Sequence, residues 1–123
     1  MRTEYQPGDL APGPVENRRH PRFKLEVAIN IYPRNLSVIK GHTVNISESG
    51  VAAILREEPP EGEVLRLEFS LPFGDVEVLA AARQRSAFRF GFEFLEDAKA
   101  QEVIRRTCRQ LAIEEALFGG HQL

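Results

Sequence analysis

The stretch LRLEFSL, residues 65–71, decides the fold class of this chain. Its apolar side chains, Leu65, Leu67, Phe69 and Leu71, alternate one by one with polar side chains. An alternation with a period of two is typical of a β-strand that buries one face and exposes the other. The centre of the chain is therefore predicted to be β-structure, and similar patterns lie on both sides of it.

Five further segments of the 123-residue chain have the composition of short strands. They cover residues 25–32, 38–46, 51–55, 76–83 and 88–95. The last segment carries four phenylalanines in alternation, which we expect on one side of the strand: Phe88, Phe90, Phe92 and Phe94. Six short strands at this spacing, separated by residues that favour turns, predict a β-barrel or a β-sandwich.

After residue 95 the apolar period lengthens to that of a helix. Asp97 is a suitable N-cap, and the residues that follow it recur at helical spacing: Ala100, Val103, Ile104, Thr107, Cys108 and Leu111. We predict a helix over residues 97–118 and expect Cys108 to pack on its inner face as a small hydrophobic residue.

The remaining segments divide the chain into one domain and two tails. Residues 1–16 hold three prolines and two glycines without apolar periodicity, which predicts a flexible N-terminal tail. Residues 119–123 are a short C-terminal tail. The domain, residues 17–118, then consists of a lead-in loop at 17–24, the strands at 25–95 and the helix.

Charge and cysteine content argue against several classes of protein. The formal net charge of -2 gives the whole chain no attraction to nucleic acid or to an anionic membrane surface. No apolar run approaches the roughly 18 residues that a membrane span needs, and the N-terminus lacks the pattern of a secretory signal. A single cysteine cannot form an internal disulfide. We expect a cytoplasmic protein without membrane insertion.

No arrangement of side chains predicts catalysis. His20, His42 and His121 lie far apart in the sequence, and none stands at a metal-ligand spacing from Cys108. No glycine-rich phosphate loop is present. We therefore expect a protein that is not an enzyme and that needs neither a cofactor nor a metal ion.

The lead-in is the one concentrated basic segment of the sequence. Residues 17–24 include three arginines and one lysine but no acidic residue. Pro21 disfavours a helix there, so the segment is predicted to be turned or extended. Arg18 and Arg22 form the pattern R-x-x-x-R.

A second pattern begins 23 residues after Arg22, where the second predicted strand turns into the third. Asn45, Ser47 and Gly50 form N-x-S-x-x-G. The two patterns in this order resemble the PilZ family, and the segment FGFEF, residues 90–94, is similar to that family's closing G-x-x-F strand. The resemblance covers about residues 17–112.

The resemblance implies a six-stranded antiparallel β-barrel followed by a C-terminal α-helix. It also implies a domain that binds cyclic di-GMP as its ligand. Arg18 and Arg22 would bind that ligand from a loop that closes over it, with Arg19 as an auxiliary. A guanidinium suits this role because it forks onto phosphate oxygens or onto the O6/N7 edge of guanine.

Three further residues take roles from the same resemblance. Asn45 and Ser47 would hydrogen-bond guanine from the barrel surface. Gly50 is expected where the turn needs a positive φ or a close approach of two backbones. Ligand binding would then change the N-terminal loop and signal to a downstream protein partner, whereas nucleic acid is not an expected partner. The oligomeric state is not predicted.

Two other readings remain open. The chain could be a degenerate PilZ module that interacts with protein and binds no nucleotide. The arginines of residues 17–24 could also be solvated charges, while Asn45 and Ser47 could only cap a β-turn.

Overall fold

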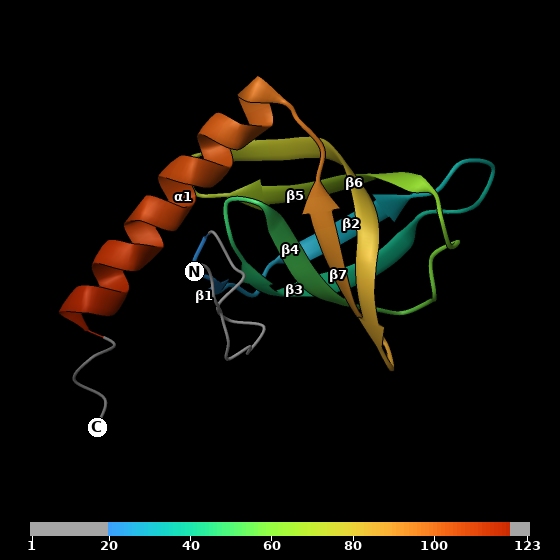
Figure 1. Cartoon of the computed structure of the whole chain (residues 1–123), viewed down its shortest axis with the longest axis horizontal. Coiled ribbons are helices and arrows are strands. Elements are labelled where there is room, and N and C mark those ends of the chain that lie inside the picture. The colour runs from blue at the N-terminus through green and yellow to red at the C-terminus, as the bar shows by residue number, and fades with distance from the viewer. Residues whose placement is uncertain (1–19, 119–123) are drawn as a thin grey trace, which may run out of the picture.

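The computed structural model describes residues 20–118 of the chain. The predicted tails at 1–16 and 119–123 lie outside the described residues, as does the first part of the lead-in. The strands are β1 (Phe23–Lys24), β2 (Ala28–Tyr32), β3 (Ile39–Ile46), β4 (Gly50–Leu55), β5 (Val64–Leu71), β6 (Gly74–Ser86) and β7 (Arg89–Phe94). One helix, α1 (Ala98–Leu117), follows them and lies beside the barrel that they form (Figure 1).

Six of the strands close into an antiparallel barrel. Their order is β3-β2-β5-β6-β7-β4. The last strand in this order, β4, pairs with the first, β3, which closes the sheet into a ring. β1 is an additional short strand, which pairs with β3 through Phe23 and Ile46. The predicted fold class, a six-stranded antiparallel barrel with a C-terminal helix, is confirmed. Closure matters for stability because an open sheet edge would leave backbone groups unpaired.

The barrel interior is filled by the alternate side chains that the sequence pattern marks. Leu65, Leu67 and Phe69 of β5 are at most 3% exposed. Phe90 and Phe92 of β7 are each 3% exposed and join the same apolar core. The side chains between these positions therefore face outward, and on β4 and β7 they form the surface described below.

The first predicted strand, residues 25–32, is interrupted at its beginning. Regular pairing starts only at Ala28, and the buried side chain of Thr43 adds two hydrogen bonds to the segment before it. Its hydroxyl donates to the carbonyl oxygen of Leu25 at 2.5 Å and accepts from the backbone N–H of Val27 at 2.9 Å. Part of the lead-in predicted as a loop, in contrast, is strand β1.

The hairpin between β6 and β7 is tighter than predicted. Ser86 pairs with Arg89, so only Ala87 and Phe88 form the turn, with Ala87 at φ 55°. The prediction that Phe88 lies in the phenylalanine row is wrong: it is 60% exposed at the turn, whereas Phe90 and Phe92 point into the core. β6 is longer than its apolar pattern suggests because its cross-strand hydrogen bonds with β5 and β7 continue through polar residues.

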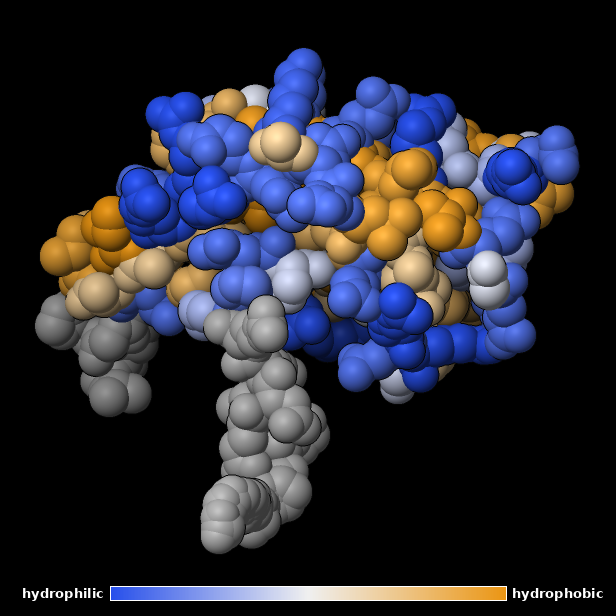
Figure 2. Space-filling view, turned by 45° about the horizontal axis from the view of Figure 1, so that its top comes forward, coloured by the Kyte–Doolittle hydropathy of each residue, from blue (hydrophilic) through white to orange (hydrophobic). Residues whose placement is uncertain are grey.

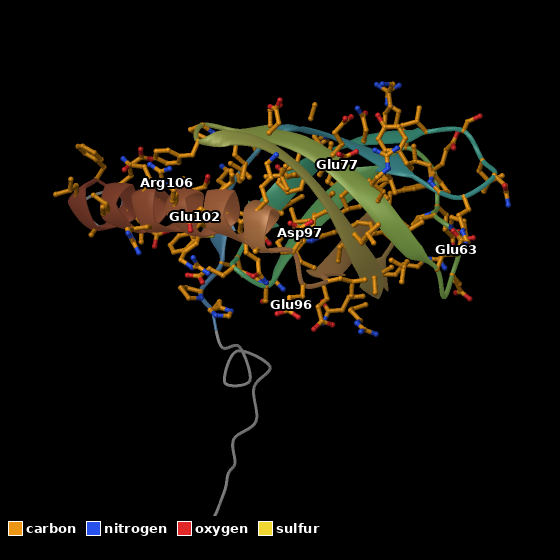
Figure 3. The ribbon with its side chains drawn as sticks, turned by 90° about the horizontal axis from the view of Figure 1, so that it is seen from above. Glu63, Glu77, Glu96, Asp97, Glu102 and Arg106 are labelled. Atoms are coloured by element: carbon orange, nitrogen blue, oxygen red, sulfur yellow. The ribbon has the colours of Figure 1, made fainter. Side chains whose placement is uncertain are left out.

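The helix begins and packs as predicted. The carboxylate of Asp97 accepts a hydrogen bond of 2.9 Å from the backbone N–H of Ala100 (Figure 3 shows Asp97 at the start of the helix). Cys108 is buried on the inner face, and burial raises the pKa of its thiol to about 11. The thiol is therefore protonated and unreactive near neutral pH.

The second half of α1 extends past the barrel. From Ala112 onward every described helix residue is exposed, and Ile113 and Leu117 leave apolar surface at this end of the helix (Figure 2). Within residues 20–118 no helix has the run of apolar residues that crossing a membrane would require. The same residues contain no cluster of His, Cys, Asp or Glu suited to a metal ion.

Candidate functional site

A hydrogen bond joins the two sequence motifs. The Nη1 atom of Arg22 donates to Oδ1 of Asn45 at 2.9 Å, across 23 residues of sequence. The contact follows from strand pairing, because β1 places Lys24 opposite Asn45 and Phe23 opposite Ile46. Phe23 is only 7% exposed, so its burial fixes the backbone directly after Arg22.

Ser47 has a structural role in the turn between β3 and β4. Its side chain is 1% exposed, and its Oγ accepts hydrogen bonds of 3.2 Å from the backbone N–H groups of Ser49 and Gly50. A hydroxyl that binds its own turn in this way stabilises the reversal of the chain. Of the two readings of Ser47 from the sequence, these contacts favour the turn.

Gly50 lies where two backbones approach closely. A Cβ atom at this position would stand 2.3 Å from the carbonyl oxygen of Phe92 on the neighbouring strand. Positive φ among the described glycines occurs at Gly62 and Gly74, so close approach and not a left-handed backbone is the reason for glycine at position 50.

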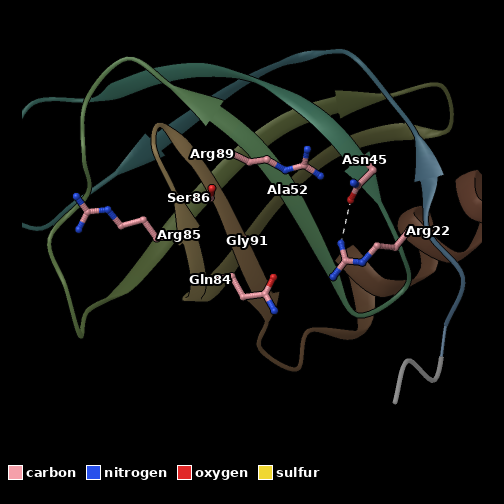
Figure 4. Close-up of a pocket in the computed structure, with 8 residues that line it drawn as sticks. All are labelled: Arg22, Asn45, Ala52, Gln84, Arg85, Ser86, Arg89 and Gly91. Carbon is pink, nitrogen blue, oxygen red and sulfur yellow. Dashed lines mark hydrogen bonds between the residues drawn. The ribbon is translucent and has the colours of Figure 1, made fainter. Parts of the chain in front are cut away.

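Two adjoining depressions lie on the outer surface beside these residues. The larger, of about 470 Å³, is drawn in Figure 4 and is bordered by Arg22, Asn45, Ala52, Gln84, Arg89 and Gly91, among others. The smaller, of about 330 Å³, is bordered by His20, Ser47, Gly50 and Glu93. Arg22, Gln84 and Gly91 border both, so the two depressions form one continuous surface across β3, β4, β7 and β6.

The hairpin of β6 and β7 adds three arginines to this surface. Arg83 pairs with Glu93 at 2.7 Å, and Arg85 pairs with Glu58. The side chain of Arg89 has neither a hydrogen bond nor an ion pair within the described part of the chain. Sequence reasoning missed these residues, because residues 17–24 were taken as the only basic segment. The available signal was the run RQRSAFR, residues 83–89, in a strand segment with no acidic residue.

Glu48, inside the second motif, connects the lead-in to the helix. Its Oε1 lies 4.0 Å from Nε2 of His20 and 3.9 Å from Nε of Arg105 on α1. These side chains are more than a third exposed, so the ion pairs are weak individually. They nevertheless bring the start of the described chain, the motif turn and α1 together.

The structure thus brings four of the six predicted ligand-binding residues together: Arg22, Asn45, Ser47 and Gly50. Arg18 and Arg19 lie outside the described residues. Cations, amides and small residues on one shallow surface suit a polar anionic ligand with planar groups, since guanidinium groups bind phosphates and guanine edges bidentately.

Comparison with known proteins gives a family and a set of similar folds. The model of the family described as "PilZ domain" matches residues 16–111. No curated protein sequence matches the chain.

Solved structures of the same fold are available. The inhibitor of motility MotI/DgrA from Bacillus subtilis has a TM-score of 0.69 at 23% identity, over 80% of this chain and 53% of that one. The PilZ domain of YcgR from Escherichia coli with c-di-GMP has a TM-score of 0.66 at 17% identity, over 85% of this chain and 98% of that domain. The chain thus spans about half the length of the Bacillus subtilis protein and nearly all of the isolated domain.

Proposed function

Because the chain belongs to the PilZ domain family, we propose that it is a cytoplasmic receptor that binds cyclic di-GMP on the surface around Arg22 and Asn45. The observation that carries the proposal is the hydrogen bond between these two side chains at the edge of the larger depression. It joins one residue of R-x-x-x-R to one residue of N-x-S-x-x-G, across 23 residues of sequence. The Escherichia coli domain of similar fold was solved with the same ligand.

Each residue of the proposed site has a defined role. Arg22 forks onto a phosphate or a guanine edge, and Asn45 hydrogen-bonds guanine. Arg18 and Arg19 bind the ligand from the other end of the lead-in. Ser47 and Gly50 act by shaping the turn that places Asn45, in keeping with the burial of the Ser47 hydroxyl.

Binding of the ligand changes the surface of the lead-in, and a downstream protein partner recognises the changed surface. Glu48 lies between His20 and Arg105, so a lead-in that rearranges on binding also alters contacts with α1. We propose a binding role for this surface and not a catalytic one, because guanidinium and amide groups of residues 20–118 predominate along the larger depression.

Isothermal titration with cyclic di-GMP, set beside cyclic di-AMP, tests the proposal. We expect binding at micromolar concentration or below, and selectivity for cyclic di-GMP. Loss of a charged hydrogen-bonding partner costs about 1.5 to 3 kcal/mol, so Arg22→Ala should weaken binding roughly ten- to a hundredfold. The control is Arg109→Ala, which removes an equal charge from the exposed face of α1.

Absence of binding by the unmodified chain would overturn the proposal and favour a PilZ module that interacts with protein alone. Equal loss in Arg22→Ala and Arg109→Ala would show that only overall charge matters. An affinity of Arg22→Ala within about threefold of the unmodified chain would remove Arg22 from the site.

A further inference from the structure

We infer that Gln84 and Arg89, from the hairpin of β6 and β7, form a second half-site that binds the second nucleotide half of the cyclic dinucleotide. This inference rests on the proposed function and assigns the ligand a position that the two sequence motifs do not define. Neither residue belongs to R-x-x-x-R or to N-x-S-x-x-G.

The register of the barrel places one row of residues across four strands. Asn45 of β3 pairs with Ala52 of β4, Ala52 pairs with Gly91 of β7, and Gly91 pairs with Gln84 of β6. The row therefore has a side-chain amide at each end and two residues with little or no side chain between them. Because neighbouring strands are about 4.8 Å apart, the two amides stand on backbone positions separated by at most about 14 Å.

The centre of this row is a shelf without bulky side chains. Phe90 and Phe92, on either side of Gly91, point into the core, so their rings do not cover the outer surface. Ala52 is 5% exposed and adds only a methyl group. A planar base can lie flat on such a surface, with its polar edges directed to the amides at either end.

Two guanidinium groups face each other over the shelf. Figure 4 shows Arg22 and Arg89 pointing toward each other from opposite ends of the depression, whereas Arg85 points away from it. Arg22 already donates a hydrogen bond to Asn45. The Arg89 side chain is exposed and has no partner among residues 20–118. Its guanidinium can therefore bind a ligand without breaking an existing ion pair.

The composition of the surface matches a ligand with two identical halves. The depression carries two guanidinium groups, those of Arg22 and Arg89, and two amides, those of Asn45 and Gln84, around Ala52 and Gly91. Cyclic di-GMP likewise has two phosphates and two guanines. Guanidinium groups bind phosphates and amides bind base edges, so two groups of each kind can hold both halves of the ligand.

Titration of three variants with cyclic di-GMP tests this inference. We expect Arg89→Ala to weaken binding about tenfold or more and Gln84→Ala to weaken it by a smaller factor. The control is Arg109→Ala, which removes an equal charge from the exposed face of α1 and borders neither depression. Its affinity should stay within about threefold of the unmodified chain. Melting temperatures should be nearly unchanged in Arg89→Ala, since that side chain has no partner to lose.

The outcomes separate this inference from the proposed function. Binding by the unmodified chain that is weakened by Arg22→Ala but unchanged in Arg89→Ala would overturn the second half-site and leave the proposed function intact. Equal weakening by Arg109→Ala and Arg89→Ala would also overturn it, because the effect would then be one of overall charge. If the unmodified chain did not bind cyclic di-GMP, both the proposed function and the second half-site would be overturned.

Discussion

Arg22 lies 2.9 Å from Asn45, with its guanidinium donating to the amide oxygen, and is therefore held against the barrel surface. The next residue, Phe23, is buried and pairs with Ile46. The lead-in is thus divided at Arg22: the part that follows it belongs to the barrel. The sequence predicted a change along all of residues 17–24, whereas the paired and buried residues 23 and 24 are already part of the sheet.

Amide hydrogen exchange should report this division. We expect the amide of Leu25, which donates to the carbonyl oxygen of Val44 at 3.1 Å, to be protected without ligand. Addition of cyclic di-GMP should raise protection mainly at residues 17–22 and around residues 45–50. A large rise at Leu25 would show that β1 forms only on binding. If protection did not change at any of residues 17–22, the conformational change on ligand binding would have to lie in another part of the chain.

Ser47 and Asn45 should differ in what their loss affects. Ser47→Ala leaves the N–H groups of Ser49 and Gly50 without their acceptor, and that of Gly50 is buried, so the free energy of unfolding should fall by about 1 to 3 kcal/mol. Asn45→Ala should cost about 0.5 kcal/mol or less but weaken ligand binding. Urea unfolding measures the stability of both variants, and titration with cyclic di-GMP measures their affinity for the ligand. A Ser47→Ala variant of full stability with lost binding would assign Ser47 to direct ligand contact.

The same substitution should have opposite effects at two buried threonines. The Thr43 hydroxyl makes hydrogen bonds to both Leu25 and Val27, so Thr43→Val should cost about 1 to 3 kcal/mol. The Thr107 hydroxyl is buried in α1 without a hydrogen-bond partner, and Thr107→Val should be neutral or stabilising by about 1 kcal/mol. Urea unfolding of both variants is the measurement. Destabilisation by Thr107→Val equal to that by Thr43→Val would contradict the distinction.

Glu68 should respond to the loss of Tyr32. The Tyr32 hydroxyl donates to Glu68 Oε1 at 2.7 Å, and this bond, followed by one from Asn30, lowers the pKa of the Glu68 carboxyl. A lowered folded-state pKa stabilises the protein above the pKa of the unfolded chain, and the stabilisation is lost as the pH falls through the folded-state pKa. Tyr32→Phe should raise the Glu68 pKa, as measured by NMR titration of its carboxyl carbon, and reduce stability at neutral pH more than in acid. An unchanged Glu68 pKa would show that this bond is not its cause.

The fold class could be predicted from local sequence patterns, and so could the turn that positions part of the candidate site. The alternation at 65–71 required a strand with one buried face, and its apolar residues are indeed in the core. Asn45 lies near the end of β3 and Gly50 begins β4, on either side of the turn that the sequence predicts there. These features are local, because side-chain period and turn chemistry depend only on nearby residues.

Only the tertiary structure decided how distant segments meet. Barrel closure sets the register that aligns Asn45, Ala52, Gly91 and Gln84, and no local pattern specifies pairing between strands so far apart in sequence. Within residues 20–118 the Arg89 side chain has no ion pair, and this likewise depends on which carboxylates the fold brings near its neighbours on the hairpin. A one-residue shift in any of these pairings would turn such side chains to the opposite face of the sheet, so the composition of the surface depends on the closed barrel as a whole.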